Sequence, residues 1–370
     1  MRVRLNTFMT GGVQVTYRLL LPCALMIASA MAWSAPQQDE VFGDDFEGFM
    51  YPACDAGLAT NDNDPNHYAA AMDLCAGVTQ QSGKPGLIDA TLTRADGTGS
   101  PSNVSYAIRS QFGSANTPQY GASMVVLSTG HAAAVGQVAP SFSAFDPGVT
   151  VGTSSGMPAD WLALHGGTPP VAPGCPDISG TTANDAVMLT LTIRVPGAAH
   201  SFSTAVNFYA ADYPEWVCSP YNDIFVALLD SVYDGTLANP SDKNLAQYFA
   251  TGSNVYPLGV NLARNTGLFR QCVTGTTGCL SGNFGTNTCT DSASLAGTGM
   301  DFSDPGHCDG NSVVGGGTGW LVLRGNVVPG EVIRLRFAIW DVSDGSLDSL
   351  VLLDNFHWST QTVTPGVTLN

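Results

Sequence analysis

The chain has 370 residues, 44% of them hydrophobic, and it is long enough to bury a large core. Its 13 Lys and Arg against 30 Asp and Glu give a formal net charge of −17 at pH 7. So negative a chain repels phosphate backbones and anionic lipid, which argues against nucleic-acid and membrane-surface roles and leaves divalent cations as the favoured charged partners.

The first 34 residues are typical of a secretory signal peptide. Arg18 precedes the apolar run LLLPCALMIASAMA, and the small residues Ala32 and Ser34 mark a cleavage site before Ala35. The run is short for a transmembrane helix, so we expect no membrane span in the mature chain. Its removal discards three arginines and no acids, which leaves 10 basic against 30 acidic residues. The sequence therefore predicts export, to the extracellular space or the cell surface.

Eight cysteines remain in the mature chain, and no C-x-x-C pair is among them. An even number of cysteines in an exported chain favours disulfides over zinc ligands or reactive thiols. Eight cysteines permit 105 pairings, so the connectivity stays open on sequence grounds. Our hypothesis joins neighbours in the sequence, namely Cys54 with Cys75, Cys175 with Cys218, Cys272 with Cys279, and Cys289 with Cys308.

Residues 35–80 are expected to form an N-terminal segment with one short helix. Asp64, Pro65 and Asn66 are good helix-start residues, and HYAAAMDLC follows them. A disulfide between Cys54 and Cys75 would tie this helix back to the chain before it.

Residues 81–360 show short β-type runs separated by Gly, Asn, Ser and Thr, a profile of an all-β protein. We predict one large β-sandwich, jelly-roll-like, with long disulfide-pinned loops, the longest of them at 261–319. Residues 361–370 are expected to be a tail. The predicted strands are Leu87–Thr93, Ser123–Ser128, Val187–Val195, Ser201–Tyr209, Ile224–Leu229, Trp320–Leu323, Val332–Trp340 and Leu350–Trp358.

The most informative stretch is 334–358, RLRFAIWDVSDGSLDSLVLLDNFHW. Leu335, Phe337 and Ile339 alternate with other residues, which predicts a strand with one face against the core. The unbroken apolar run 350–353 predicts a central strand covered on both faces.

Three carboxylates, Asp341, Asp344 and Asp348, fall in the short connection between those two strands. Together with Asn222 and Asp223 they could supply the oxygen ligands of a calcium ion, if the two strands that carry them are neighbours. The spacing does not match an EF-hand loop. The alternative is that these aspartates cap turns through local hydrogen bonds, which needs no metal.

Two stretches together resemble the choice-of-anchor L domain family of bacterial exported proteins. They are NFYAADYPEWVCSPYNDIFVALLD, from Asn207 to Asp230, and WDVSDGSLDSLVLLDNF, from Trp340 to Phe356. The resemblance covers roughly residues 80–360 and is strongest with the cysteine-bearing members. It implies an extracellular or cell-surface β-rich domain with no established reaction and no catalytic residues to transfer.

The catalytic motifs are weak. Gly152–Gly156, GTSSG, matches the G-x-S-x-G pattern of serine hydrolases, but we expect no strand-to-helix elbow around Ser154. The metalloprotease motif H-E-x-x-H is absent, and a glycosidase would need only two facing carboxylates, which sequence cannot place.

The sequence thus favours a secreted or cell-surface module with a binding or structural, adhesin- or matrix-like role over an enzyme. Trp216 and Tyr213, in a Pro-flanked corner, are the candidates for an aromatic platform toward a glycan or another envelope or matrix component. The alternative is a secreted hydrolase, acting on glycans, on the same scaffold.

Overall fold

The computed structural model describes residues 53–134, 136–140, 146–264, 266–280, 282, 285–303 and 313–369, all within one compact unit that spans Val41–Asn370. The predicted signal peptide, residues 1–34, lies outside the described residues. Within the described ranges, no helix is long and apolar enough to cross a membrane.

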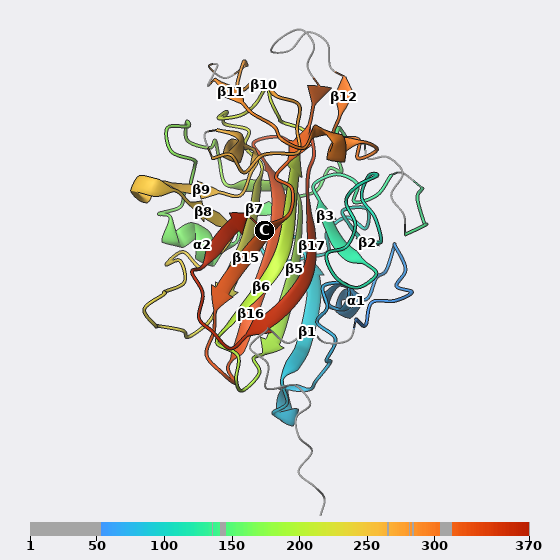
Figure 1. Cartoon of the computed structure of the whole chain (residues 1–370), viewed down its shortest axis with the longest axis vertical. Helices are drawn as coiled ribbons and strands as arrows, with labels where there is room; N and C mark the ends of the chain where they lie inside the picture. Colours follow the sequence, from blue (N-terminus) through green and yellow to red (C-terminus); the bar gives the residue numbers. More distant parts are fainter. Residues whose placement is uncertain are drawn as a thin grey trace, which may run out of the picture. The chain divides into compact units, whose positions relative to one another are not determined.

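The predicted all-β sandwich is confirmed (Figure 1). The two α-helices of the described ranges are α1 (Pro65–Ala70) and α2 (Ala159–Leu164). The longer strands are β1 (Gly86–Thr93), β3 (Met124–Ser128), β5 (Thr182–Arg194), β6 (Ser201–Ala210), β7 (Ile224–Asp230), β15 (Leu321–Asn326), β16 (Val332–Val342) and β17 (Ser349–Ser359). The shorter ones are β2 (Tyr106–Arg109), β4 (Ser154–Gly156), β8 (Gln247–Phe249), β9 (Val255–Pro257), β10 (Gly275–Thr276), β11 (Thr286–Asn287), β12 (Phe302–Ser303), β13 (Val313–Val314), β14 (Gly316–Gly317) and β18 (Gly366–Leu369).

Two antiparallel sheets form the sandwich. The five-stranded sheet has the order β1-β5-β16-β7, with β4 paired to β5. The seven-stranded sheet has the order β18-β15-β6-β17-β3-β2, with β14 paired to β6. Because β16 belongs to the first sheet and β17 to the second, the connection at 343–348 crosses from one sheet to the other.

The core between the sheets follows from strand alternation. Leu335, Phe337 and Ile339 of β16 are buried there, as predicted, and Val351 and Leu353 of β17 face them from the second sheet. The other β17 face carries Leu350 and Leu352, which are buried in a separate cluster under the loops that hold Leu295 and Met300. Strand β17 is therefore covered on both faces, which confirms its predicted central position.

The outer face of the five-stranded sheet is closed by α2, which sequence analysis missed. Trp161 of α2 packs edge-on against Trp340 of β16, with 5.8 Å between ring centroids, and both are fully buried. Helices α1 and α2 lie on opposite flanks of the sandwich (Figure 1). Helix α1 begins as predicted, with the Asp64 side chain accepting a hydrogen bond from the Asn66 backbone N–H.

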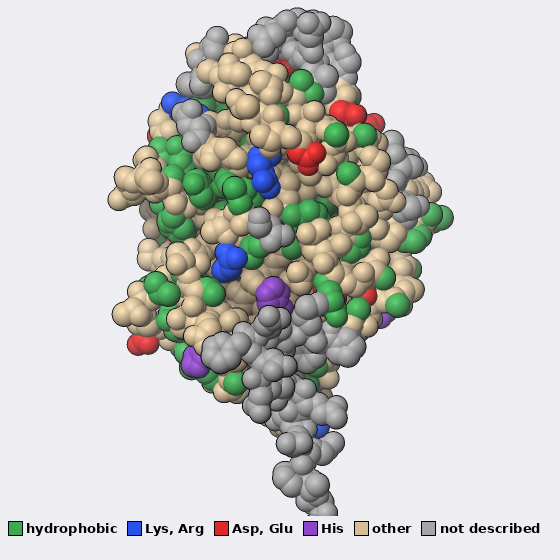
Figure 2. Space-filling view, viewed as in Figure 1, with side chains coloured by type: hydrophobic (Ala, Val, Ile, Leu, Met, Phe, Trp, Pro, Cys, Tyr) green, Lys and Arg blue, Asp and Glu red, His purple; other side chains and the backbone are tan. Residues whose placement is uncertain are grey.

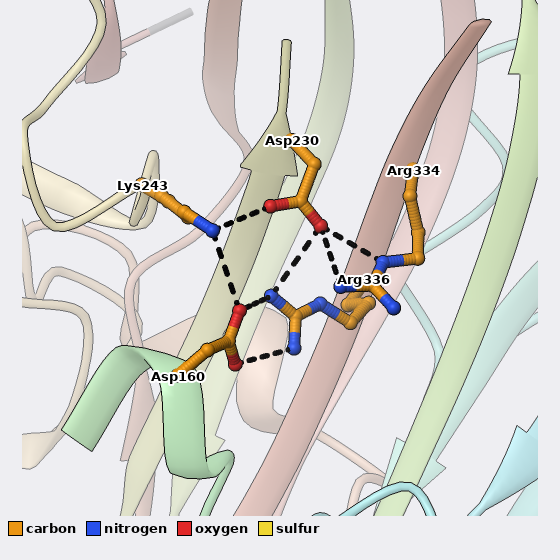
Figure 3. Close-up of polar contacts among 5 residues, drawn as sticks. All are labelled: Asp160, Asp230, Lys243, Arg334 and Arg336. Carbon is orange, nitrogen blue, oxygen red and sulfur yellow. Dashed lines mark hydrogen bonds and ion pairs between the residues drawn. The ribbon is translucent and has the colours of Figure 1, made fainter. Parts of the chain in front are cut away.

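Charged side chains also hold α2 in place (Figure 3). Both nitrogens of the Arg336 fork donate to the two oxygens of Asp160, at 2.9 and 2.7 Å. Asp230 accepts from Lys243 at 2.7 Å and from Arg334 at 2.8 Å. Figure 2 shows how sparse charged side chains are on the face that it draws. Asp160, Asp230, Arg334, Arg336 and Lys243 thus form one network of ion pairs in a chain that has few charged residues.

Three disulfides are described, and they confirm two of the four predicted pairs, Cys54–Cys75 and Cys175–Cys218. The predicted pairs of Cys272 with Cys279 and of Cys289 with Cys308 are wrong, because Cys272 is bonded to Cys289. The hairpin of β10 and β11 aligns Gly275 with Asn287 and brings the residues at its two bases together. Cys279, which is also disulfide-bonded, lies in the loop of that hairpin, and Cys308 lies outside the described residues.

The expected tail at 361–370 is also partly wrong. Residues 366–369 form β18, which pairs with β15 along its whole length and completes one edge of the seven-stranded sheet. Val367 is buried in the core between the sheets, so hydrophobic packing stabilises this strand.

Candidate cation site

The crossing between the two sheets is lined by buried carboxylates. Asp341 is the penultimate residue of β16 and Asp348 immediately precedes β17, and both are fully buried. Strand β7 is the neighbour of β16, with Ile224 opposite Trp340, so Asp223 comes next to Asp341. Asp212, just past the end of β6, joins them from the seven-stranded sheet. The structure therefore gathers four aspartates at this crossing, which we call the acidic cluster.

Of the five predicted calcium ligands, Asp341, Asp348 and Asp223 belong to the acidic cluster, and Asp344 and Asn222 do not. Asp344 is exposed and accepts a hydrogen bond from the Ser346 backbone N–H at 3.2 Å, so it forms a turn at the rim. Asn222 is buried near Gly259, and its amide oxygen accepts no hydrogen bond. Asp212 was not among the predicted ligands, because its proximity to the crossing depends on the chain path after β6 and cannot be read from a local sequence pattern.

Few donors satisfy these carboxylates. Asp348 accepts a hydrogen bond from the Val149 backbone N–H at 2.9 Å, and Asp223 accepts a long one from Val342 at 3.4 Å. Neither oxygen of Asp341 accepts a hydrogen bond, and one oxygen each of Asp212, Asp223 and Asp348 is also unpartnered. The nearby Thr129 hydroxyl donates instead to the Ser349 carbonyl oxygen, at 3.3 Å.

The electrostatics of the cluster follow from burial and mutual repulsion. Burial raises the pKa of Asp348 to about 8 and that of Asp223 to about 7. Burial, and then the charge of Asp223, raise the pKa values of Asp212 and Asp341 well above the ordinary value. The charges that add to the pKa shifts of Asp212, Asp341 and Asp348 are those of other aspartates. Four carboxyls so placed must either keep protons or be neutralised by a cation.

The backbone is shaped around the cluster at Gly130. A Cβ added there would lie 2.0 Å from an oxygen of Asp348, so only glycine leaves room for this carboxylate. Among the described residues, however, no three His, Cys, Asp or Glu side chains already stand as a group that could hold a metal ion. Binding would therefore require the carboxylates to draw together around the ion.

The predicted aromatic platform is not supported at Tyr213, which is fully buried. Its ring stacks on Phe269, with 5.0 Å between centroids, and its hydroxyl donates to the Val273 carbonyl at 2.8 Å. Trp216 is partly exposed and packs edge-on against Tyr221. The corner holds aromatic residues as predicted, but Tyr213 is part of the core.

Ser154 of the GTSSG motif begins the short strand β4, which pairs with β5. Helix α2 does follow this strand, contrary to expectation, but Ser154 is exposed at the far end of β4 and not on a strand-to-helix elbow.

Comparisons with family models, with curated proteins and with solved structures gave no match.

Proposed function

We propose that this chain is an exported binding or structural module, adhesin- or matrix-like, whose β-sandwich takes up calcium at the acidic cluster. The single observation that carries the calcium part is Asp341, a fully buried carboxylate with no hydrogen bond to either oxygen, surrounded by three other aspartates. Calcium prefers six to eight oxygen ligands and is abundant outside cells.

Three features support export and a scaffold role. The described disulfides suit an oxidising compartment. The chain begins with a signal-peptide pattern, and its motifs resemble those of choice-of-anchor L domains. We propose membership of that family, and a glycan or another cell-envelope or matrix component as the partner.

Calcium would act as a clamp between the sheets. Asp341 lies one residue before the end of a strand of one sheet and Asp348 precedes a strand of the other, so one ion shared by them would fix the crossing. Asp212 and Asp223 would add ligands from the ends of β6 and β7, with water and backbone carbonyls completing the shell.

The test is thermal unfolding of the oxidised protein with calcium and with chelator. We expect calcium to raise the unfolding midpoint of the wild type by several degrees, and the Asp341→Asn and Asp348→Asn variants to lose that response. Asp89→Asn, at an exposed position of β1, is the matched control and keeps it. If the wild type ignores calcium and Asp341→Asn is more stable than the wild type, the cluster holds protons and the calcium proposal is wrong.

A further inference from the structure

A hollow on the outer face of the seven-stranded sheet brings together a serine, a histidine and an arginine from three neighbouring strands. Its volume is about 320 Å³, and Ser203, His357 and Arg324 are among its lining residues. They form one row across the sheet, because Ser203 of β6 is aligned with His357 of β17 on one side and with Arg324 of β15 on the other.

The serine and the histidine are hydrogen-bonded to each other. The Ser203 hydroxyl lies 2.8 Å from Nε2 of His357. The other ring nitrogen, Nδ1, lies 3.3 Å from the backbone carbonyl of Asn355, which can only accept. This arrangement fixes the tautomer with the proton on Nδ1, so that Nε2 accepts the serine proton. In covalent catalysis a base accepts the proton of the nucleophile and a third group orients the base, and here Ser203, His357 and the Asn355 carbonyl stand in those positions.

A β-bulge creates this pair. From Ser349 to Asp354 the β17–β6 register is regular, and if it continued, Phe356 would stand opposite Ser203. One extra residue is inserted after Asp354, where Asn355 adopts φ +52°. The insertion reverses the alternation of β17 and turns His357, in place of Phe356, toward Ser203. Bulges recur beside active sites because they redirect a side chain in this way.

Two further features suit chemistry at Ser203. Burial lowers the pKa of His357, which keeps the imidazole neutral and able to accept a proton. Arg324 lines the same hollow, where its guanidinium donates to the Thr368 hydroxyl, and its positive charge also lowers the pKa of His357. A cation there can stabilise the negative charge that develops on a carbonyl oxygen under attack.

We propose that Ser203, His357 and Arg324 form a site that hydrolyses esters of small carboxylic acids, an activity separate from the calcium-bound scaffold. Ser203 Oγ attacks the carbonyl carbon while its proton passes to Nε2 of His357. The charged carbonyl oxygen faces Arg324, and the ester C–O bond breaks as the alcohol leaves with the proton from Nε2. Water then attacks the acyl carbon while Nε2 takes its proton, the bond between the acyl carbon and Oγ breaks, and Nε2 returns the proton to Oγ, which releases the acid and restores Ser203. The volume of the hollow, about 320 Å³, is near the lower end of the range for ligand sites, about 300 to 1,000 Å³, which favours an ester with a short acyl group.

The first test labels the full oxidised chain with a fluorophosphonate and maps the adduct by mass spectrometry. We expect one label per chain, on Ser203, and the same yield with calcium or chelator. Ser201 lines the same hollow but donates its hydroxyl to the Gln361 carbonyl, so Ser201→Ala is the matched control and keeps the label. A folded wild type that takes no label at Ser203 overturns the proposal.

The second test follows hydrolysis of p-nitrophenyl acetate. We expect Ser203→Ala and His357→Gln to abolish it, and Arg324→Gln to lower the rate at least tenfold, with thermal unfolding used to confirm that each variant is folded. Unchanged labelling of Ser203 in folded His357→Gln would show that the pair is only a cross-strand contact. Since neither readout needs calcium, the outcome here is independent of the calcium experiment.

Discussion

Gly130 is the residue on which the acidic cluster depends most directly, because the Asp348 carboxylate occupies the space of its missing side chain. We predict that Gly130→Ala lowers the free energy of unfolding by about 1 to 3 kcal/mol, since the new methyl group would displace a buried carboxylate. Gly197→Ala is the control, because a Cβ added there meets nothing within 4 Å. Equal denaturation midpoints for the two variants would show that Asp348 can move away at little cost.

A second group of buried aspartates governs the response to pH near α1. Asp73 is 4% exposed, follows α1, and accepts no hydrogen bond at either oxygen. The charged groups that face it are Asp55 and Asp354, whose carboxylates accept backbone N–H bonds from Ala122 and Tyr120. Burial, and then the charge of Asp55, raise the pKa of Asp73 to about 7.

We predict that this group makes the fold less stable as pH rises. An unfolded aspartate has a pKa of about 4, so between about pH 4 and 7 the folded chain holds a proton that the unfolded chain gives up. The contribution of Asp73 to the free energy of unfolding is fully present below that range and is lost as pH rises through 7. Asp73→Asn, which tolerates the φ of +70° at this position, should reduce the fall in unfolding free energy between pH 5 and pH 8 by about 2 to 4 kcal/mol. Denaturant titrations at the two pH values measure it, and an unchanged fall would mean that Asp73 is ionised in the folded state.

At the scale of elements, α2 is attached to β16 by one buried cation. The Arg336 side chain is 7% exposed and binds Asp160 with both nitrogens, whereas the Arg334 side chain is 51% exposed. We predict that Arg336→Gln lowers the unfolding free energy by about 1 to 3 kcal/mol, because it leaves Asp160 without its bidentate partner. Arg334→Gln, the control on the same strand, should cost less than about 1 kcal/mol. Similar losses in urea titrations would contradict this assignment.

The elements that sequence analysis predicted are those whose pattern is local. Strand β16 shows its buried face through Leu335, Phe337 and Ile339, and β17 shows its two covered faces through an unbroken apolar run. Helix α2 was not predicted because it has only six residues, too few to show the periodic pattern of apolar residues that marks a helix. Its stability comes from Trp161 against Trp340 and from Arg336, contacts that are distant in sequence.

The candidate sites show the same division. Asp341, Asp348 and Asp223 could be grouped from sequence because they flank neighbouring strands, while Asp212 required the chain path after β6. The Ser203–His357 pair could not be foreseen at all. Strict alternation places Phe356 opposite Ser203, and only the inserted residue in β17 changes that parity.

At the scale of the whole molecule, the disulfides show why sequence neighbours are an unreliable guide to pairing. The correct pairs, Cys54–Cys75 and Cys175–Cys218, close segments that the chain path folds back locally. The wrong pairs fell in the loop at 261–319, where the β10–β11 hairpin sets the geometry and selects Cys289 as the partner of Cys272. The even number of cysteines predicted that they form disulfides, but the pairing of β10 with β11 determines that Cys272 bonds to Cys289.

Strand β18 has a consequence for self-association. Through residues 366–369 it pairs with Leu321–Arg324 of β15 and occupies the outward N–H and C=O groups of that part of the strand. Peeling these four residues away would turn β15 into an open edge, the template on which strands of separate molecules add to one another. Strand β18 replaces the six-residue edge of β15 with a four-residue edge, and short edge strands are poorer templates for pairing between molecules, so we expect deletion of residues 366–369 to increase self-association.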